Sequence, residues 1–182
     1  PQQAVGGGGS VARAVGEDGS ARDDQGRQRW MGELRDEPQR QAGGLGNRGN
    51  ADHSLGEYDK AIDYNGGALK MGEQIGDRQG QATALGGLGG TYSSLGEYDK
   101  AIDYLPRSLA ISEQIDDRSG LASSLGGLGY AYINAGEVKK GLAYCQQALQ
   151  MEEKLSDRRS QGVHWNNIGE GYAILGQRLD AL

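Results

Sequence analysis

The decapeptide LGEYDKAIDY occupies Leu55–Tyr64 and returns unchanged at Leu95–Tyr104, so its two copies start forty residues apart. Repetition at a fixed spacing of this size is the signature of a protein built from stacked structural units. When the chain is aligned with itself at a shift of forty, further positions match without any insertion. The matching columns hold an apolar residue, a turn glycine, a small residue and a tyrosine: Leu55, Leu95, Ala135 and Leu175; Gly56, Gly96, Gly136 and Gly176; Ala61, Ala101, Gly141 and Ala181; Tyr92, Tyr132 and Tyr172.

Each unit contains two helical patterns with a break between them. In residues 83–94, apolar residues recur at the spacing of one helix face. Leu95-Gly96-Glu97 interrupts this pattern, and a second amphipathic pattern follows over residues 98–115. A helix, a tight turn and a second helix form an αα-hairpin, and repeated hairpins stack into a superhelical solenoid. The sequence therefore predicts an all-α solenoid of antiparallel helix pairs.

The register of forty divides the chain into about four and a half units. The clear units span residues 43–82, 83–122 and 123–162, and a truncated unit at residues 163–182 stops early in its second helix. Residues 1–42 are Gly-rich, yet Val15-Gly16-Glu17 keeps the register of the first turn. We interpret residues 1–42 as a degenerate N-terminal repeat, and a disordered Gly-rich tail is the alternative.

The columns resemble the tetratricopeptide repeat, and the unit that starts at residue 83 supplies its pattern in order. The residues that carry the resemblance are Leu85, Leu88-Gly89, Tyr92, Gly96, Tyr98 and Ala101. The unit of forty is longer than the usual unit of about 34 residues. It is similar to arrays of G-protein-signalling modulators and of bacterial, notably cyanobacterial, multidomain proteins. The resemblance implies a right-handed superhelix that acts as a scaffold for protein–protein interaction, and it covers residues 43–182 better than residues 1–42.

The resemblance also implies how the small and aromatic residues pack. Where the first helix of a unit meets its second helix, a side chain would hold the two apart, and the glycines expected there are Gly89, Gly129 and Gly169. The tyrosines expected to fill the gap between units are Tyr92, Tyr132 and Tyr172. Cys145 falls at a position of the second helix that is usually apolar or aromatic, so we expect it in the core.

The chain is unusually rich in helix-breaking residues, with 33 glycines. Of the glycines in LGGLGG (residues 85–90) only Gly89 is expected from the repeat, and each other one costs about 0.5–1 kcal/mol relative to alanine. Pro106 falls in the middle of a predicted helix, where proline costs about 3 kcal/mol. Either neighbouring helices, including those of other chains, override these local preferences, or some of the glycines stand in place of other residues.

Composition and motifs exclude several classes of function. The net charge of −6 opposes binding to nucleic acid, and no apolar run is long enough for a membrane span. The Gly-rich stretches lack the Lys-Ser/Thr of a phosphate-binding loop. His53 and His164 have no second histidine or cysteine at metal-ligand spacing, and Cys145 has no base suggested beside it. We therefore predict no enzyme activity, no cofactor and no metal site, and the sequence leaves the cellular compartment open.

The resemblance implies that the first helix of each unit lines a groove in which a partner peptide lies. The implied groove residues are Asn50, His53, Ser93, Ser94, Tyr130, Asn134, Asn167 and Glu170, together with Ser54 and Asn166. They lack the Lys and Arg of repeats that clamp the C-terminal carboxylate of a partner. The expected partner is therefore a protein or peptide with a polar or basic segment, or another copy of the chain.

The ends of the array suggest an alternative function as a structural subunit. Ala181 and Leu182 remain as packing residues of an interrupted helix, and neither end of the chain shows an obvious polar cap. If the end of one chain completes the start of the next, the contact does not close on itself and a filament results. The alternative prediction is therefore a head-to-tail homo-oligomer assembled through these ends.

Overall fold

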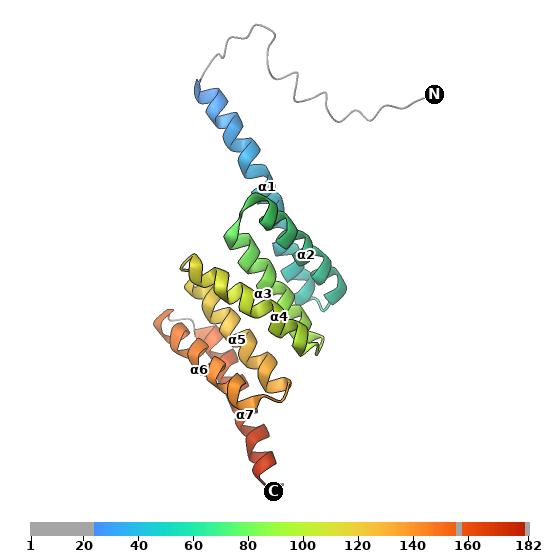
Figure 1. The fold of residues 1–182 in the computed structure, drawn as a ribbon, viewed down its shortest axis with the longest axis vertical. Coiled ribbons are helices and arrows are strands. Elements are labelled where there is room, and N and C mark those ends of the chain that lie inside the picture. Colours follow the sequence, from blue (N-terminus) through green and yellow to red (C-terminus); the bar gives the residue numbers. More distant parts are fainter. Residues whose placement is uncertain (1–23, 156–157, 181–182) are drawn as a thin grey trace, which may run out of the picture. The chain divides into compact units, whose positions relative to one another are not determined.

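The computed structural model describes the backbone of residues 24–155 and 158–180, and within these ranges it contains seven helices and no strand (Figure 1). Residues 36–153 and 161–176 are described with their side chains. The predicted all-α fold is confirmed. The helices are α1 (Asp24–Ser54), α2 (Tyr58–Ile75), α3 (Arg78–Ser94), α4 (Tyr98–Gln114), α5 (Arg118–Asn134), α6 (Val138–Leu155) and α7 (Arg158–Asp180).

The predicted turn between the two helices of a unit is present in the first three units of the array. Gly56, Gly96 and Gly136 all adopt positive φ angles, of 78°, 76° and 91°, which only glycine reaches without strain. In the middle unit the amide of Glu97 donates to the carbonyl of Tyr92 over 2.9 Å and closes the turn. The glycine column therefore marks where each first helix must end.

Two aspartates that are each followed by an arginine, Asp77 and Asp117, cap the first helix of the next unit. The Asp77 carboxylate accepts a hydrogen bond from the amide of Gly80, and Asp117 accepts one from the amide of Gly120, each over 3.0 Å. Such a cap satisfies an amide that the helix itself leaves unpaired. For this reason α3 begins at Arg78, five residues before the periodic pattern that starts at residue 83.

Consecutive helices from α2 to α7 pack against one another, and α3, α5 and α7 also contact each other in order. The apolar core is accordingly a series of small clusters between neighbouring helices. One cluster joins α4 to α5 and includes Leu105, Leu128 and Tyr132. Another joins α5, α6 and α7 and includes Ile133, Cys145 and Ile168, so the predicted core position of Cys145 is confirmed. This serial core is the packing scheme of a helical solenoid.

The tyrosine column makes contacts within each helix pair that the prediction did not include. Tyr92 stacks on Tyr104, and Tyr132 stacks on Tyr144, in both cases with ring centroids 5.5 Å apart and planes 8° from parallel. Each stack lies within one helix pair, because the partner tyrosine belongs to the second helix of the same unit. Tyr172 has no such helix opposite it and is 55% exposed. Tyr92 and Tyr132 therefore tie their own helix pairs together, and both also pack in the cluster that joins α4 to α5 of the following unit.

The glycines of the first helices fall into two groups. A Cβ atom on Gly89 would lie 2.5 Å from Leu105 Cγ, and one on Gly129 would overlap the Cys145 sulfur, so the predicted close contacts at these two positions are confirmed. The prediction for Gly169 is wrong, since a Cβ there would meet nothing within 4 Å. Gly87, Gly126 and Gly127 also face close neighbours, so Gly89 is not the only glycine that the packing requires; Gly90 faces open space.

We expect Gly90→Ala to raise the free energy of unfolding by about 0.5–1 kcal/mol, because alanine favours the helix and its Cβ meets nothing. The adjacent substitution Gly89→Ala is expected to lower it by about 1–3 kcal/mol through overlap with Leu105. Urea unfolding followed by circular dichroism measures both. Stabilisation by Gly89→Ala would show that α3 and α4 do not approach each other as described.

The predicted turn at Leu175-Gly176 is wrong, because α7 continues through Gly176 to Asp180. A turn is favoured when a helix after it packs back, and no helix after α7 is present among the described residues. Continuing the helix instead adds one hydrogen bond for each residue. Ala181 and Leu182 lie outside the described residues, so their predicted role at the assembly ends stays a prediction.

At the start of the array, α1 is one continuous helix across the boundary predicted between residues 42 and 43. The division into a degenerate repeat at residues 1–42 and an array at residues 43–182 stays a prediction, since residues 1–23 lie outside the described part. Among the described helices, none is both long and apolar enough to span a membrane.

Candidate partner-binding groove

Two adjoining hollows lie along the first helices of the units. The first has a volume of about 550 Å³ and is lined by α1, α3, α4 and α5, and the second has about 480 Å³ and is lined by α1, α3, α5, α6 and α7. They share the lining residues His53, Gly90, Ser119 and Ser123 and are therefore continuous. We call these two hollows together the groove.

Most of the residues predicted for a groove line one of the hollows. Asn50 and His53 line the first hollow; His53, Ser93, Ser94, Tyr130 and Asn167 line the second. Asn134 and Glu170 line neither, and the same holds for Ser54 and Asn166.

Two of these residues, Asn134 and Glu170, interact with Tyr130 instead. The Asn134 amide nitrogen donates to the carbonyl of Tyr130 over 2.9 Å. Burial raises the pKa of the Tyr130 phenol, and the nearby Tyr98 and Glu170 raise it further. Asn134 and Glu170 therefore flank the second hollow through Tyr130 without forming its wall.

The glycines that local propensity does not explain form much of the groove wall. Gly86, Gly87 and Gly90 of α3 line the first hollow, and Gly126 and Gly127 of α5 line the second. At these positions a larger side chain would reduce the volume of the hollows. The signal was present in the sequence as the segment LGGLG, which recurs at residues 85–89 and 125–129.

Hydrogen bonds between hydroxyl groups connect the helices around the first hollow. Ser124 Oγ donates to Ser108 Oγ over 3.1 Å, and Ser108 Oγ donates to the carbonyl of Ala82 over 2.8 Å. At one end, the Gln79 amide donates to Asp117 Oδ2 over 2.9 Å. This bond, together with the bond from the Gly120 amide, lowers the pKa of the Asp117 carboxyl. The first hollow is therefore polar, and the Asp117 carboxyl that lines it is ionised at neutral pH.

The second hollow contains a buried pair of ionisable side chains that the sequence analysis missed. Glu152 of α6 and His164 of α7 are each 5% exposed, and Glu152 Oε1 lies 3.1 Å from His164 Nε2. The two atoms do not meet hydrogen-bond geometry, and Glu152 Oε2 and both imidazole nitrogens lack a partner among the described residues. The imidazole occupies the space beside Gly126, where any Cβ would overlap it. The lack of a side chain at Gly126 therefore leaves the space that His164 occupies in the wall of the second hollow.

The groove carries negative charge. Among the described residues that line the two hollows, Asp117 and Glu152 are acidic and none is lysine or arginine. Cys145 does not line the groove, since it is fully buried in the core, where burial raises its pKa to about 11. The thiol therefore stays protonated at neutral pH.

A solenoid of helix pairs with a groove along its first helices defines an αα-repeat protein. Two family models, both described as tetratricopeptide repeat, match residues 40–114 and 122–155. The chain belongs to the tetratricopeptide repeat family. Such repeats indicate a scaffold for protein–protein interaction, and the family is generally non-catalytic. No curated protein matches the chain.

Several solved structures share the fold. BtubC (BKLC) from P. vanneervenii superposes with a TM-score of 0.67 at 21% identity, covering 79% of this chain and 61% of BtubC. The tetratricopeptide repeat domain of Arabidopsis FLU gives 0.61 at 23% identity, over 64% of this chain and 98% of that domain. A similar protein from Chlorobium tepidum gives 0.63 at 15% identity, over 74% and 96%. This chain spans 61% of the length of BtubC, and these identities show the fold alone.

Proposed function

We propose that this chain is a non-catalytic scaffold that binds a segment of another polypeptide in the groove. Membership of the family supports protein–protein interaction as the function. The groove is the observation from which we choose the surface that binds the partner. Two continuous hollows run across α1, α3, α5 and α7, with buried side chains whose polar atoms have no partner among the described residues. Buried polar atoms favour a ligand that completes their hydrogen bonds.

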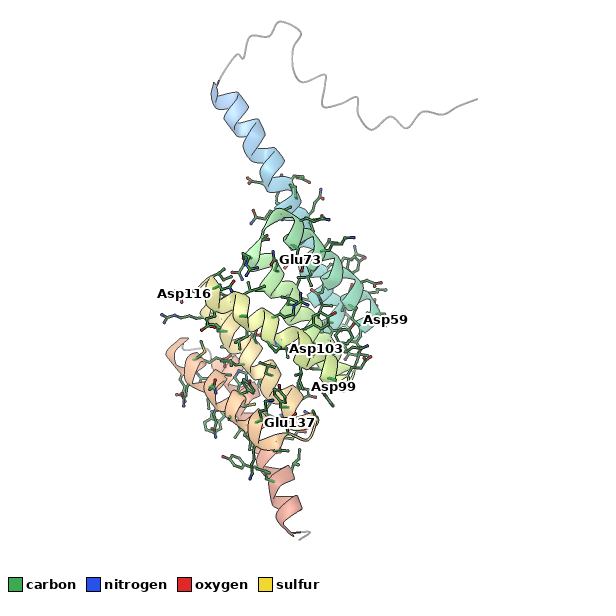
Figure 2. All side chains as sticks on the ribbon, in the orientation of Figure 1. Asp59, Glu73, Asp99, Asp103, Asp116 and Glu137 are labelled. Atoms are coloured by element: carbon green, nitrogen blue, oxygen red, sulfur yellow. The ribbon has the colours of Figure 1, made fainter. Side chains whose placement is uncertain are left out.

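The rest of the described surface offers a contrast to the groove. The acidic residues labelled in Figure 2 are exposed and line neither hollow. They lie on α2 and α4 and on the connections between helices: Asp59, Glu73, Asp99, Asp103, Asp116 and Glu137. Exposed charges of this kind are hydrated and need no partner, so the groove is the better candidate site.

Peptides selected from a random phage-displayed library on the immobilised chain would test the proposal. We expect Ser123→Trp to weaken the selected peptides by more than about tenfold in fluorescence anisotropy, because Ser123 is exposed and lines both hollows. Lys139→Trp, at an exposed position of α6 outside both hollows, is the matched control and should leave the affinity unchanged. Equal affinities for both variants would place the binding surface elsewhere.

The alternative function, self-assembly, is favoured by one observation on α7. Trp165 and Tyr172 are 59% and 55% exposed, whereas the equivalent Leu125 and Tyr132 are 7% and 8% exposed. Gly169 lies between them on the helix and its Cα faces open space, whereas the equivalent Gly129 is covered by α6. This apolar face of α7 is where a helix from a second copy would pack.

Sedimentation velocity over a range of concentrations tests self-assembly. We expect the average mass to rise with concentration for the wild type and to stay constant for Trp165→Ser. Leu55→Ser makes a comparable change at a turn that is 72% exposed, and it should behave as the wild type. A wild-type chain that remains monomeric at every concentration would contradict this second candidate and leave the groove proposal intact.

A further inference from the structure

We infer that the second hollow of the groove binds a basic side chain, lysine or arginine, of the bound segment, with Glu152 as its counterion. The inference rests on the proposed function, since it assumes that a polypeptide lies in the groove. It adds the chemistry of the partner, which the family does not determine.

Glu152 and His164 depart from the repeat at two positions that face each other. The residues in register with Glu152 are Gly72 and Ser112, and those in register with His164 are Ala84 and Ser124. The other units therefore pack at these positions with small side chains. Stacking of the units does not require an ionisable pair here, and burying charged groups without full partners is unfavourable. A ligand that completes the interactions of Glu152 and His164 would give this pair a role, whereas packing of the units gives it none.

Two of the unpartnered atoms around the second hollow, one on Glu152 and one on Ser93, can accept a hydrogen bond. Within the described part of the chain, Glu152 Oε2 has no hydrogen-bond partner, and Ser93 Oγ, on α3, is also buried without one. Glu152, Ser93 and the phenol-bearing Tyr130 line the same hollow of about 480 Å³. A lysine ammonium carries three donors and an arginine guanidinium five, and neither carries an acceptor. Either group could donate to Glu152 and to Ser93 together.

The charge and the aromatic content of the wall favour the same ligand. None of the described residues lining this hollow is lysine or arginine, so the Glu152 carboxylate has no cation of fixed charge beside it. His53 and His164 are the other titratable groups of the wall, apart from the Tyr130 phenol. The ring of Tyr130 offers a face on which a cation is attracted. An acidic side chain would instead meet Glu152 as a like charge.

Capped fluorescent peptides of equal length, made of repeated Gly-Ser-Lys, Gly-Ser-Gln or Gly-Ser-Glu, provide the test by anisotropy. We expect the wild type to bind the Lys peptide more tightly than the Gln peptide, and the Glu peptide least. Glu152→Gln keeps the shape of the side chain and should weaken the Lys peptide at least about tenfold without changing the Gln peptide. The control is Glu153→Gln, which makes the same charge change at the next, exposed residue of α6 and should have no effect.

The outcomes separate this inference from the proposed function. Equal weakening by Glu152→Gln and Glu153→Gln would mean attraction by net charge alone, and the inference would be wrong. If Ser123→Trp abolishes binding of the library-selected peptides and Glu152→Gln leaves it unchanged, the inference is wrong. The groove would then remain the proposed binding surface. If no peptide binds, and the library yields none, the proposed function itself fails.

A second measurement on the wild type covers the case in which Glu152→Gln does not fold. The Cε1–H resonance of His164, assigned with the variant His53→Gln, should shift on titration with the Lys peptide, because the ligand enters beside Glu152. It should shift much less with the Gln peptide. Equal shifts with both peptides, or none with either, would contradict a basic side chain in the second hollow.

Discussion

Replacing Pro106 with glutamine is expected to raise the free energy of unfolding by about 2 kcal/mol. Pro106 lies inside α4, where it lacks the amide that would bond to the carbonyl four residues earlier and its ring crowds that carbonyl. In a helix interior these effects cost about 3 kcal/mol. Proline also stiffens the unfolded chain, and losing that effect removes at most about 1 kcal/mol of the gain. The helix effect is the larger of the two, so the variant is more stable.

Glutamine is the matched replacement because Gln146 holds the equivalent position in α6, and both residues are exposed. Urea unfolding followed by circular dichroism measures the change. The reciprocal variant Gln146→Pro should lose about 3 kcal/mol or more. If Pro106→Gln is neutral or destabilising while Gln146→Pro behaves as expected, then α4 packs between α3 and α5 in a way that requires the proline.

The repeat could be predicted from the sequence because its turns depend on a local conformation. Gly96 and its equivalents Gly56 and Gly136 adopt positive φ angles, so they are needed wherever a first helix ends and the chain turns back. That requirement leaves a glycine at every fortieth position. Gly176 shows the limit of this argument, because the same residue in the same column stays helical in α7. A turn also needs a following helix that packs back.

The groove could be predicted only in part. Asn50, His53, Ser93, Ser94, Tyr130 and Asn167 line the hollows, as the family pattern indicated. Glu152 and His164 were missed because they meet between the second helix of one unit and the first helix of the next, a contact that the pattern of a single unit does not display. The signal that could have found them was their departure from the small residues in register with them.

The glycines of α3 and α5 show the same dependence on contacts between units. Propensity treats Gly87, Gly90 and Gly127 alike, as residues that weaken a helix. In the folded chain Gly87 and Gly127 each face a side chain of the preceding unit, Asn65 and Leu105 respectively, while Gly90 faces open space. Propensity does not distinguish them, and the contact with the neighbouring unit does. Helix propensity is therefore overridden at two of the three positions.

Asn65→Leu is expected to raise the free energy of unfolding by about 2 kcal/mol. Asn65 of α2 is fully buried, and among the described residues neither its amide nitrogen nor its amide oxygen has a hydrogen-bond partner. Burying an amide in this way costs about 1–3 kcal/mol in proteins. The positions in register are apolar, Leu105 and Cys145, and both are buried in the core. Leucine would remove the unpartnered amide and add apolar contact.

The larger side chain should fit, because the two sites have the same walls. A Cβ on Gly49 would lie 2.5 Å from the Asn65 side chain and one on Gly87 2.8 Å from it. Leu105 lies between Gly89 and Gly127, the residues in register with these two glycines. A leucine is therefore already accommodated by this pair of glycines one unit further along the chain.

Leu105→Asn is the reciprocal variant and should lower the free energy of unfolding by about 4 kcal/mol, since it buries an amide and removes apolar packing. Urea unfolding of both variants measures the two changes. Stabilisation of about 2 kcal/mol by Asn65→Leu would show that the amide is an unpaired group that the fold carries at a cost. A loss of stability would show instead that the amide is satisfied in solution, by water reaching it from the first hollow through Gly87. In that case the polar core position in α2 belongs with the groove rather than with the packing of the solenoid.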